Sequence, residues 1–310
     1  MKPDSDHPFP LAAAYGLAVV NALIIGLSFS FVKVAVTLAG PVDTLAFRFL
    51  IALAVCIVYA RIKGIRPRFD LKNSLRLLPM GACYPLGFFL FQGFGLLYAS
   101  SGEAGILNAT GPIFTAIIAA TFIRERYNPV QCFSILLSVV GVIYIAYQKG
   151  ASLNPDHIAG IALILLSALS GAGYAVLNRT LVRHFTTFEI TYYLMIVGAV
   201  AFTLASLVQR AVHGTWATVF TPFSDTSFTT AILYLALFSS LLTTVFASLA
   251  LNRLTSAGLT LFLNLSTIVS ILVGYFRLGE AVHAYHLIGA AMILAGLVGT
   301  NWFTGSRSRP

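Results

Sequence analysis

Charged side chains are scarce in this sequence. They make up 9% of the 310 residues, whereas 58% of the residues are hydrophobic. A soluble globular domain has roughly 25% charged residues, because much of its surface faces water. The composition therefore excludes an ordinary soluble protein and predicts that most of the chain is surrounded by lipid.

Cysteine is nearly absent, and no motif indicates a metal or a cofactor. Cys56, Cys83 and Cys132 lie in apolar runs without a Cys-x-x-Cys pair, which excludes a disulfide framework. Gly-x-Ser-x-Gly, His-Glu-x-x-His and phosphate-loop patterns are also missing. A Glu-x-x-His spacing at 280–283 occurs once, where di-metal bundles need it twice. We therefore expect no catalytic residues, no metal site and no cofactor.

Acidic residues are outnumbered, because 10 Asp and Glu stand against 19 Lys and Arg and give a net charge of +9. The basic residues gather in short segments between apolar runs, as the positive-inside rule expects. If the N-terminus is inside, 14 of the 19 fall in inner segments, 3 in outer loops and 2, Lys33 and Arg48, within helices. The sequence thus predicts that both termini are cytoplasmic, and it predicts no nucleic-acid partner.

Long apolar runs fill most of the chain. A membrane-spanning helix needs roughly 20 mainly apolar residues, and backbone amides in hydrocarbon must bond within their own segment. Ten runs meet this description, near residues 11–36, 42–61, 74–98, 101–123, 129–148, 157–178, 187–209, 228–251, 255–276 and 282–303. The prediction is an all-α, polytopic membrane protein with ten transmembrane helices.

The two halves of the sequence resemble one five-helix unit that occurs twice. Asn108 aligns with Asn264, and Glu125 aligns with Glu280 after a one-residue gap. Because five is odd, the second copy must cross the membrane in the opposite sense, which gives two inverted five-helix repeats. The predicted divisions are a cytoplasmic N-terminus (1–10), a first repeat (11–148), an outer linker (149–156), a second repeat (157–303) and a cytoplasmic C-terminus (304–310).

Glu125 and Glu280 each stand at a break between two apolar runs. We interpret both as structural residues near the membrane surface. Glu280 precedes the tenth run, where its carboxylate would favour the positive N-terminal end of the next helix.

Four charges gather in the predicted outer half of the first repeat. Arg48 lies roughly 9 Å into the second helix at 1.5 Å per residue. Lys33 lies near the outer end of the first helix, and Asp43 and Glu103 begin the second and fourth. Charges within spanning segments are usually functional or paired, so Arg48 either binds substrate or pairs with an acid that locks helices together. Lys33 is interpreted as snorkelling, and Glu103 and Asp43 are candidates for proton coupling.

The third apolar run is the predicted wall of a substrate site. Tyr84, Phe88 and Phe91 share one helical face, and Gln92 lies close to it. An aromatic stripe can also serve packing alone. However, lipid has no use for Gln92, and Pro85 frees a backbone carbonyl that a cavity or a neighbour must satisfy.

Two asparagines complete the predicted substrate site. Asn108 and Asn264 lie mid-helix at matching repeat positions, where the pseudo-two-fold axis would bring them face to face. They are candidates either for substrate contact or for polar contacts between helices. Pro112, one turn after Asn108, predicts a kink in the fourth helix.

Three motifs carry a family resemblance. They are LAFRFLIAL in the second helix, NATGPIFTAIIAATFIRERYNPVQ across the fourth and fifth, and FRLGEAVHAYHLIGAAMILAGL across the ninth and tenth. In this order they resemble the EamA family of the drug/metabolite transporter superfamily, from about residue 11 to 303. The resemblance implies export of small metabolites, commonly amino acids, across a bacterial inner membrane through a central cavity between the repeats. Arg48 and Glu125 match typical Arg and Glu positions, whereas Ile25 and Gly171 stand where the family often has tryptophan.

The expected function is that of a secondary transporter, not an enzyme, which exports a small amphipathic metabolite by alternating access. Its expected partners are that substrate, the lipid bilayer and, as a candidate coupling ion, the proton. One alternative is a carrier of phosphorylated or nucleotide-linked sugars, although helices six to ten offer no mid-helix Lys or Arg for such anions. A lipid-modifying enzyme has only the residues at 280–283 as a candidate site, and the inverted repeat argues against a structural subunit.

Overall fold

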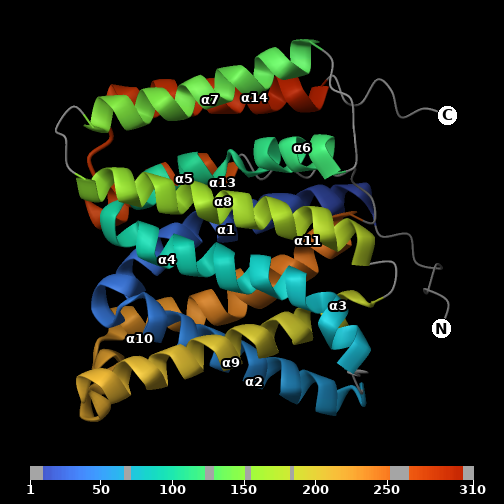
Figure 1. The fold of residues 1–310 in the computed structure, drawn as a ribbon, viewed down its shortest axis with the longest axis vertical. Coiled ribbons are helices and arrows are strands. Elements are labelled where there is room, and N and C mark those ends of the chain that lie inside the picture. The colour runs from blue at the N-terminus through green and yellow to red at the C-terminus, as the bar shows by residue number, and fades with distance from the viewer. Residues whose placement is uncertain are drawn as a thin grey trace.

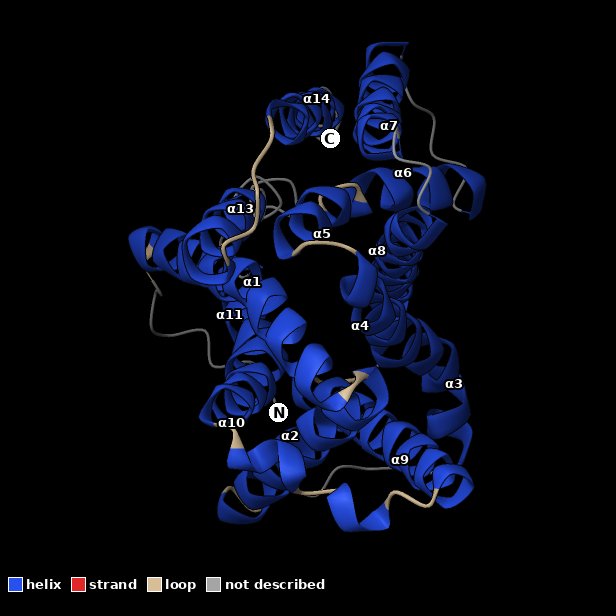
Figure 2. Ribbon diagram, turned by 90° about the vertical axis from the view of Figure 1, so that its left-hand side faces the viewer, coloured by secondary structure: helices blue, strands red, loops and turns tan. Residues whose placement is uncertain are grey.

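The computed structural model describes residues 10–65, 71–122, 129–150, 155–181, 185–251 and 265–302. Every regular element in these ranges is helical (Figure 2). The predicted all-α fold is therefore confirmed.

Within the described ranges, the helices group into ten apolar segments, which we number spans 1 to 10 in chain order. Span 3 combines two α-helices joined by a kinked segment, span 8 combines two α-helices with a π-helical segment between them, and span 4 combines two α-helices. Spans 1 to 5 consist of α1 (Leu11–Ala39) in span 1, α2 (Pro41–Ile62) in span 2, α3 (Leu71–Gly81), η1 (Ala82–Gly87) and α4 (Phe88–Tyr98) in span 3, α5 (Ser101–Asn108) and α6 (Gly111–Phe122) in span 4, and α7 (Pro129–Gly150) in span 5. Spans 6 to 10 consist of α8 (Pro155–Leu181) in span 6, α9 (Thr187–His213) in span 7, α10 (Thr226–Leu233), η4 (Tyr234–Leu242) and α11 (Thr243–Leu251) in span 8, α13 (Leu265–Leu278) in span 9, and α14 (Ala284–Trp302) in span 10. Two short 3-10 helices, η2 (Trp216–Thr218) and η3 (Thr221–Ser224), lie between spans 7 and 8.

The outer surface of this bundle is apolar. Six helical stretches in the described chain are long and apolar enough to cross a membrane, and spans 5, 9 and 10 supply shorter apolar helices. Large side chains such as Ile62 and Phe276 are 76% and 79% exposed. Such surface is suited to hydrocarbon and not to water, as expected of a polytopic membrane protein.

The contacts between helices follow the predicted repeat. The most extensive ones join span 3 to span 6, span 5 to span 10, span 1 to span 8, span 2 to span 7 and span 4 to span 6. Exchanging spans 1–5 with spans 6–10 maps each of these contacts onto itself or onto another observed contact, such as span 1 with span 9. The pattern is that of two copies related by a pseudo-two-fold axis.

Two helix pairs flank the centre of the molecule. α7 and α14 lie together at one edge, α2 and α9 lie at the other, and the remaining spans lie between them (Figures 1 and 2). α7 and α14 approach closely through glycine, because a Cβ on Gly141 would lie 3.1 Å from the Gly289 carbonyl oxygen. Small residues of this kind allow the backbone contact that stabilises helix pairs in lipid.

Three spans depart from regular α-helix, and the sequence contains a signal for two of them. α5 ends at Asn108 and α6 begins at Gly111, beside Pro112, so the predicted interruption of span 4 is present. Spans 3 and 8, which are equivalent in the two repeats, both depart from α-helix within the span, through a kink at Tyr84 in span 3 and a π-helical segment in span 8. Pro85 accounts for the kink because it lacks an amide hydrogen. No comparable signal marks the π-helical segment.

Several turns between spans share one end of the molecule. α1 passes into α2 through Gly40, whose φ of 76° favours glycine, and Pro41 begins α2. The junctions of α4 with α5, α9 with α10 and α13 with α14 lie at the same end, on the left in Figure 1. We call it the left-hand end.

Candidate functional site

Arg48 lies in the interior of the bundle. Its side chain comes from α2 and is 1% exposed. Its Nε donates a hydrogen bond to Ser240 Oγ at 2.8 Å, and Nη2 donates to Ser239 Oγ at 3.2 Å. The guanidinium also lies 4.1 Å from the centroid of the Phe89 ring, within cation–π range. In the part of the chain that the structure describes, these hydroxyls and this ring hold Arg48, and no carboxylate forms a salt bridge with it.

The π-helical segment of span 8 brings both serines to Arg48. Ser239 and Ser240 lie inside η4, and Ser240 Oγ also donates to the Leu235 carbonyl at 3.0 Å. A π-segment widens the helix locally and is often found at functional sites. Arg48 was predicted from the sequence, whereas the two serines were not, because Ser in an apolar run does not indicate a π-segment.

The kinked segment of span 3 places an aromatic group beside Arg48. Tyr84 has extended backbone angles, φ −146° and ψ 115°, inside this segment. Its ring centroid is 5.3 Å from that of Phe88, 4.8 Å from that of Phe89 and 4.7 Å from that of Tyr174. Tyr84 is also close enough to Arg48 for an electrostatic interaction. The structure thus brings together Arg48, Tyr84 and Phe88, three residues of the predicted site.

The other predicted site residues lie around this group or outside the described chain. Phe91 is partly buried and Gln92 is 5% exposed, one turn beyond Phe88 on α4. Asn108 is partly buried at the last residue of α5. Asn264 lies outside the described residues, as does Glu125, so the predicted pairings of these two residues are not described.

Asp43 pairs with Arg210 and not with Arg48. It forms an ion pair with Arg210 Nη2 and accepts a hydrogen bond from Ser206 Oγ, which ties the start of α2 to the end of α9. Arg210 is 5% exposed and also donates to the Thr215 carbonyl at 2.6 Å. A groove of about 390 Å³ beside this pair is lined in part by Leu38 and Asp225. Asp43, a candidate for proton coupling, therefore joins spans 2 and 7 at the left-hand end.

Lys33 has a structural role that differs from snorkelling. Its Nζ donates to the carbonyl oxygens of Leu96 and Ala99, at 2.5 and 3.0 Å. The last carbonyls of a helix have no partner within the helix, so a cation there is stabilising. Lys33 therefore joins span 1 to the end of α4.

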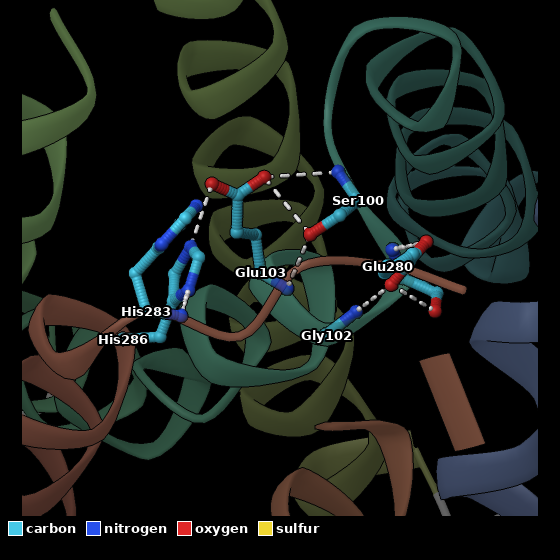
Figure 3. A network of polar contacts seen from close by, with 7 residues as sticks. Ser100, Gly102, Glu103, Glu280, His283 and His286 are labelled. Atoms are coloured by element: carbon cyan, nitrogen blue, oxygen red, sulfur yellow. Dashed lines mark hydrogen bonds and ion pairs between the residues drawn. The ribbon is translucent and has the colours of Figure 1, made fainter. Parts of the chain in front are cut away.

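Glu103 is buried beside a histidine that the sequence analysis did not single out as its partner (Figure 3). Its carboxylate accepts from Ser100 N at 2.9 Å and Ser100 Oγ at 3.0 Å, while Ser100 Oγ accepts from Glu103 N, which completes a capping box. His286 Nε2 lies 3.2 Å from Glu103 Oε1. Because His286 Nδ1 accepts from the His283 amide at 3.0 Å, we assign the proton to Nε2, which donates to Glu103. This contact links span 4 to span 10.

Glu280 caps α5 and not the helix that follows it in sequence. Its Oε1 accepts from Ser101 N at 2.7 Å, and its Oε2 accepts from Ser101 Oγ at 2.8 Å and Gly102 N at 3.1 Å (Figure 3). Gly279, with a φ of 66°, makes the turn that sends Glu280 back toward α5. Glu280 lies at a helix N-terminus, as its structural interpretation predicted. That helix is α5 of the first repeat, however, and not α14 of the second.

The comparisons with known proteins identify the family. The sequence model of the EamA-like transporter family matches this chain twice, at residues 12–147 and 158–302. The chain belongs to the EamA-like transporter family. A member of similar length is an uncharacterized transporter, YcxC, from Bacillus subtilis (strain 168), which is 41% identical over 288 residues, covering 93% of this chain and 92% of that protein.

More distant relatives of this EamA-like chain have names that include a cargo. A probable terminal-alkyne amino-acid exporter of Streptantibioticus cattleyicolor is 27% identical, covering 96% of this chain and 97% of that protein. A probable amino-acid metabolite efflux pump of Salmonella typhimurium is 25% identical, covering 91% and 92%. A solved crystal structure shares the fold, with a TM-score of 0.65 and 17% identity over 97% of this chain and all of the other.

A glycine of α8 lies against the aromatic group. A Cβ on Gly171 of α8 would lie 3.1 Å from the Phe88 ring, so the glycine allows Phe88 to pack directly against α8. The ring of Phe88 therefore lies against bare backbone of α8.

Proposed function

We propose that this EamA-like protein is a secondary transporter that exports a small amphipathic metabolite with an anionic group, such as an amino acid. The transport would proceed by alternating access about the group formed by Arg48, Tyr84 and Phe88. The membrane would be the bacterial inner membrane with both termini in the cytoplasm, so the left-hand end would face outward. We assign no catalytic step to the protein.

The observation that carries this proposal is the charge on Arg48. A buried guanidinium is costly unless an anion compensates it, and hydroxyls and an aromatic ring compensate only partly. A carboxylate on the substrate would supply the missing charge and form short, bidentate hydrogen bonds. Arg48 would then bind the anionic group, while Tyr84 and Phe88 would contact the apolar part of the substrate.

The number of buried cations favours a singly charged anion over a sugar phosphate or a nucleotide-linked sugar. Among the described residues, Arg48 and Arg210 are the buried arginines, and Arg210 is already paired with Asp43. A multiply anionic ligand would need several unpaired cations around it. The names of the two relatives with stated cargoes agree with an amino-acid-like substrate.

The remaining predicted residues keep secondary roles in this proposal. Gln92, Phe91, Asn108 and Asn264 would complete the substrate site as the repeats rock. Glu103 and Asp43 remain candidates for proton coupling, with Glu103 the stronger because a histidine binds its carboxylate inside the bundle.

The test is transport by purified protein in proteoliposomes. Neutral amino acids would be compared with the corresponding amines, which lack the carboxylate, with and without a pH gradient. We expect transport of the amino acids and not of the amines, and Arg48→Gln should reduce it about 100-fold because a buried charge-assisted contact is lost. Glu103→Gln should abolish any stimulation by the pH gradient.

Arg277→Gln is the matched control. Arg277 also lies over an aromatic ring, 4.1 Å from the Phe31 centroid, but it is exposed at the left-hand end. It should transport like the unmodified protein. Equal transport of amines and amino acids, or an undiminished rate in Arg48→Gln, would overturn the assignment.

A further inference from the structure

The turn between α4 and α5 is held by side chains from three other segments. Lys33 of span 1 binds the carbonyls that end α4, His286 of span 10 binds Glu103, and Glu280 binds the first amides of α5. Two of these three attachments cross from the second repeat to the first. They meet at the left-hand end, next to the contact of α5 with α13 (Figures 2 and 3).

The Glu280 contact is not needed to cap the N-terminus of α5. α5 already has its own N-cap, because Ser100 and Glu103 form a capping box within one segment. The amides of Ser101 and Gly102 would otherwise be satisfied by water at the membrane surface. What Glu280 adds is an attachment between the two repeats, made by one carboxylate through three hydrogen bonds.

The neighbouring backbone leaves room for this carboxylate. A Cβ on Gly274 of α13 would clash with Glu280 Oε2 and lie 2.8 Å from Ser101 Oγ. One turn deeper, a Cβ on Gly105 of α5 would clash with Ser270, which is fully buried. α5 and α13 thus touch along a face of small residues, with the Glu280 carboxylate at its outer margin.

Resting on the proposed transport function, we propose that this contact is the gate at the left-hand end. Glu280 with Ser101 and Gly102, which we name the Glu280 latch, is closed while the substrate path is shut at this end and opens when α5 and α13 separate. In lipid, apolar contact between helices gives little net attraction, so the polar latch sets the balance between closed and open forms. The latch is also readily reversible, because both the carboxylate and the released amides are hydrated at the surface.

The experiment measures the opening directly, without substrate. Cys83 and Cys132 are replaced by Ala, Cys56 is retained and Ser270→Cys is added, with the protein in lipid nanodiscs. The thiol introduced at position 270, which we name the reporter thiol, would lie beneath the latch between α5 and α13. Cys56 is 4% exposed in a different core of the bundle and reports general loosening. The measured quantity is the rate at which each thiol reacts with a charged maleimide, resolved by peptide mass spectrometry.

Three substitutions disturb the latch in different ways. Glu280→Gln removes its charge, Gly274→Ala displaces the carboxylate by volume, and Ser101→Ala removes one of its hydrogen bonds. We expect the reporter thiol to react about 10-fold faster in Glu280→Gln and Gly274→Ala, and less so in Ser101→Ala, with Cys56 unchanged. Glu189→Gln is the control, because Glu189 accepts from Thr186 N at 2.9 Å in the capping box of a single helix, and it should leave the reporter thiol at its original rate.

The outcomes separate the gate from its alternatives. Unchanged rates at the reporter thiol in every variant that remains folded would show that the latch is only a static cap. Parallel increases at Cys56 and the reporter thiol would show general loosening, and either result overturns the proposal. Failure of the protein to transport amino acids in proteoliposomes would overturn the proposed function instead, since the thiol rates need no substrate.

Discussion

The centre of the bundle and its left-hand end both join the two repeats through polar side chains, but their charges are balanced differently. At the left-hand end, Asp43 meets Arg210, and the carboxylates of Glu103 and Glu280 accept several hydrogen bonds each. In the centre, Arg48 faces hydroxyls and rings. Paired charges hold helices together, whereas a charge that has no opposite partner among the described residues is suited to a ligand.

The largest expected effect compares the two buried arginines by replacing each with Met. Arg210→Met leaves Asp43 without its ion-pair partner, so we expect a loss of about 3 kcal/mol in the free energy of unfolding. Arg48→Met leaves only hydroxyls without a partner, and these can donate to helix carbonyls as Ser240 already does to Leu235. We therefore expect the free energy of unfolding to change by less than about 1 kcal/mol. Reversible unfolding in mixed micelles measures both. Similar losses in the two variants would show that Arg48 is paired in the protein.

A smaller effect is expected where the serines position Arg48. Combining Ser239→Ala with Ser240→Ala frees the guanidinium to take other orientations, so KM for the substrate should rise about 10-fold with little change in kcat. Thr230→Ala is the control in the same span, because the Thr230 hydroxyl donates to Thr226 of its own helix at 2.7 Å. A fall in kcat at unchanged KM would argue that the serines serve the conformational change and not binding.

The smallest effect is expected at the aromatic group. Gly171→Ala places a methyl group against the Phe88 ring, which must move by a few tenths of an ångström. Relative rates among amino acids of different size should therefore change about 3-fold. Gly16→Ala, where a Cβ would have no neighbour within 4 Å, should leave the preference unaltered. If both variants behave alike, Phe88 does not contribute to substrate selection.

Patterns local to the sequence predicted the fold well. Apolar runs, prolines and the internal repeat gave the spans, the interruption of span 4 and the arrangement of two related halves. The sequence also predicted the burial of Arg48 and the neighbouring Tyr84 and Phe88, because an Arg deep in an apolar run and aromatics at helical spacing are visible without the fold.

The contacts that the sequence analysis missed depend on segments far apart in the chain. The pairing of Asp43 with Arg210, of Glu103 with His286, and of Glu280 with α5 each joins residues from different repeats. Which acid meets which base at one end of a bundle is decided by how the spans pack. The assignment of Glu280 to its own next helix failed for this reason.

The pairing of span 5 with span 10 has a consequence for biosynthesis. The principal neighbour of α7 is α14 of the other repeat, and spans 2 and 4 likewise pack on spans 7 and 9. Among the described residues, these three spans of the first repeat therefore have their most extensive contacts with the second repeat. Because spans 1 to 5 are synthesised first, their contact faces stay open to lipid until spans 7, 9 and 10 have been inserted.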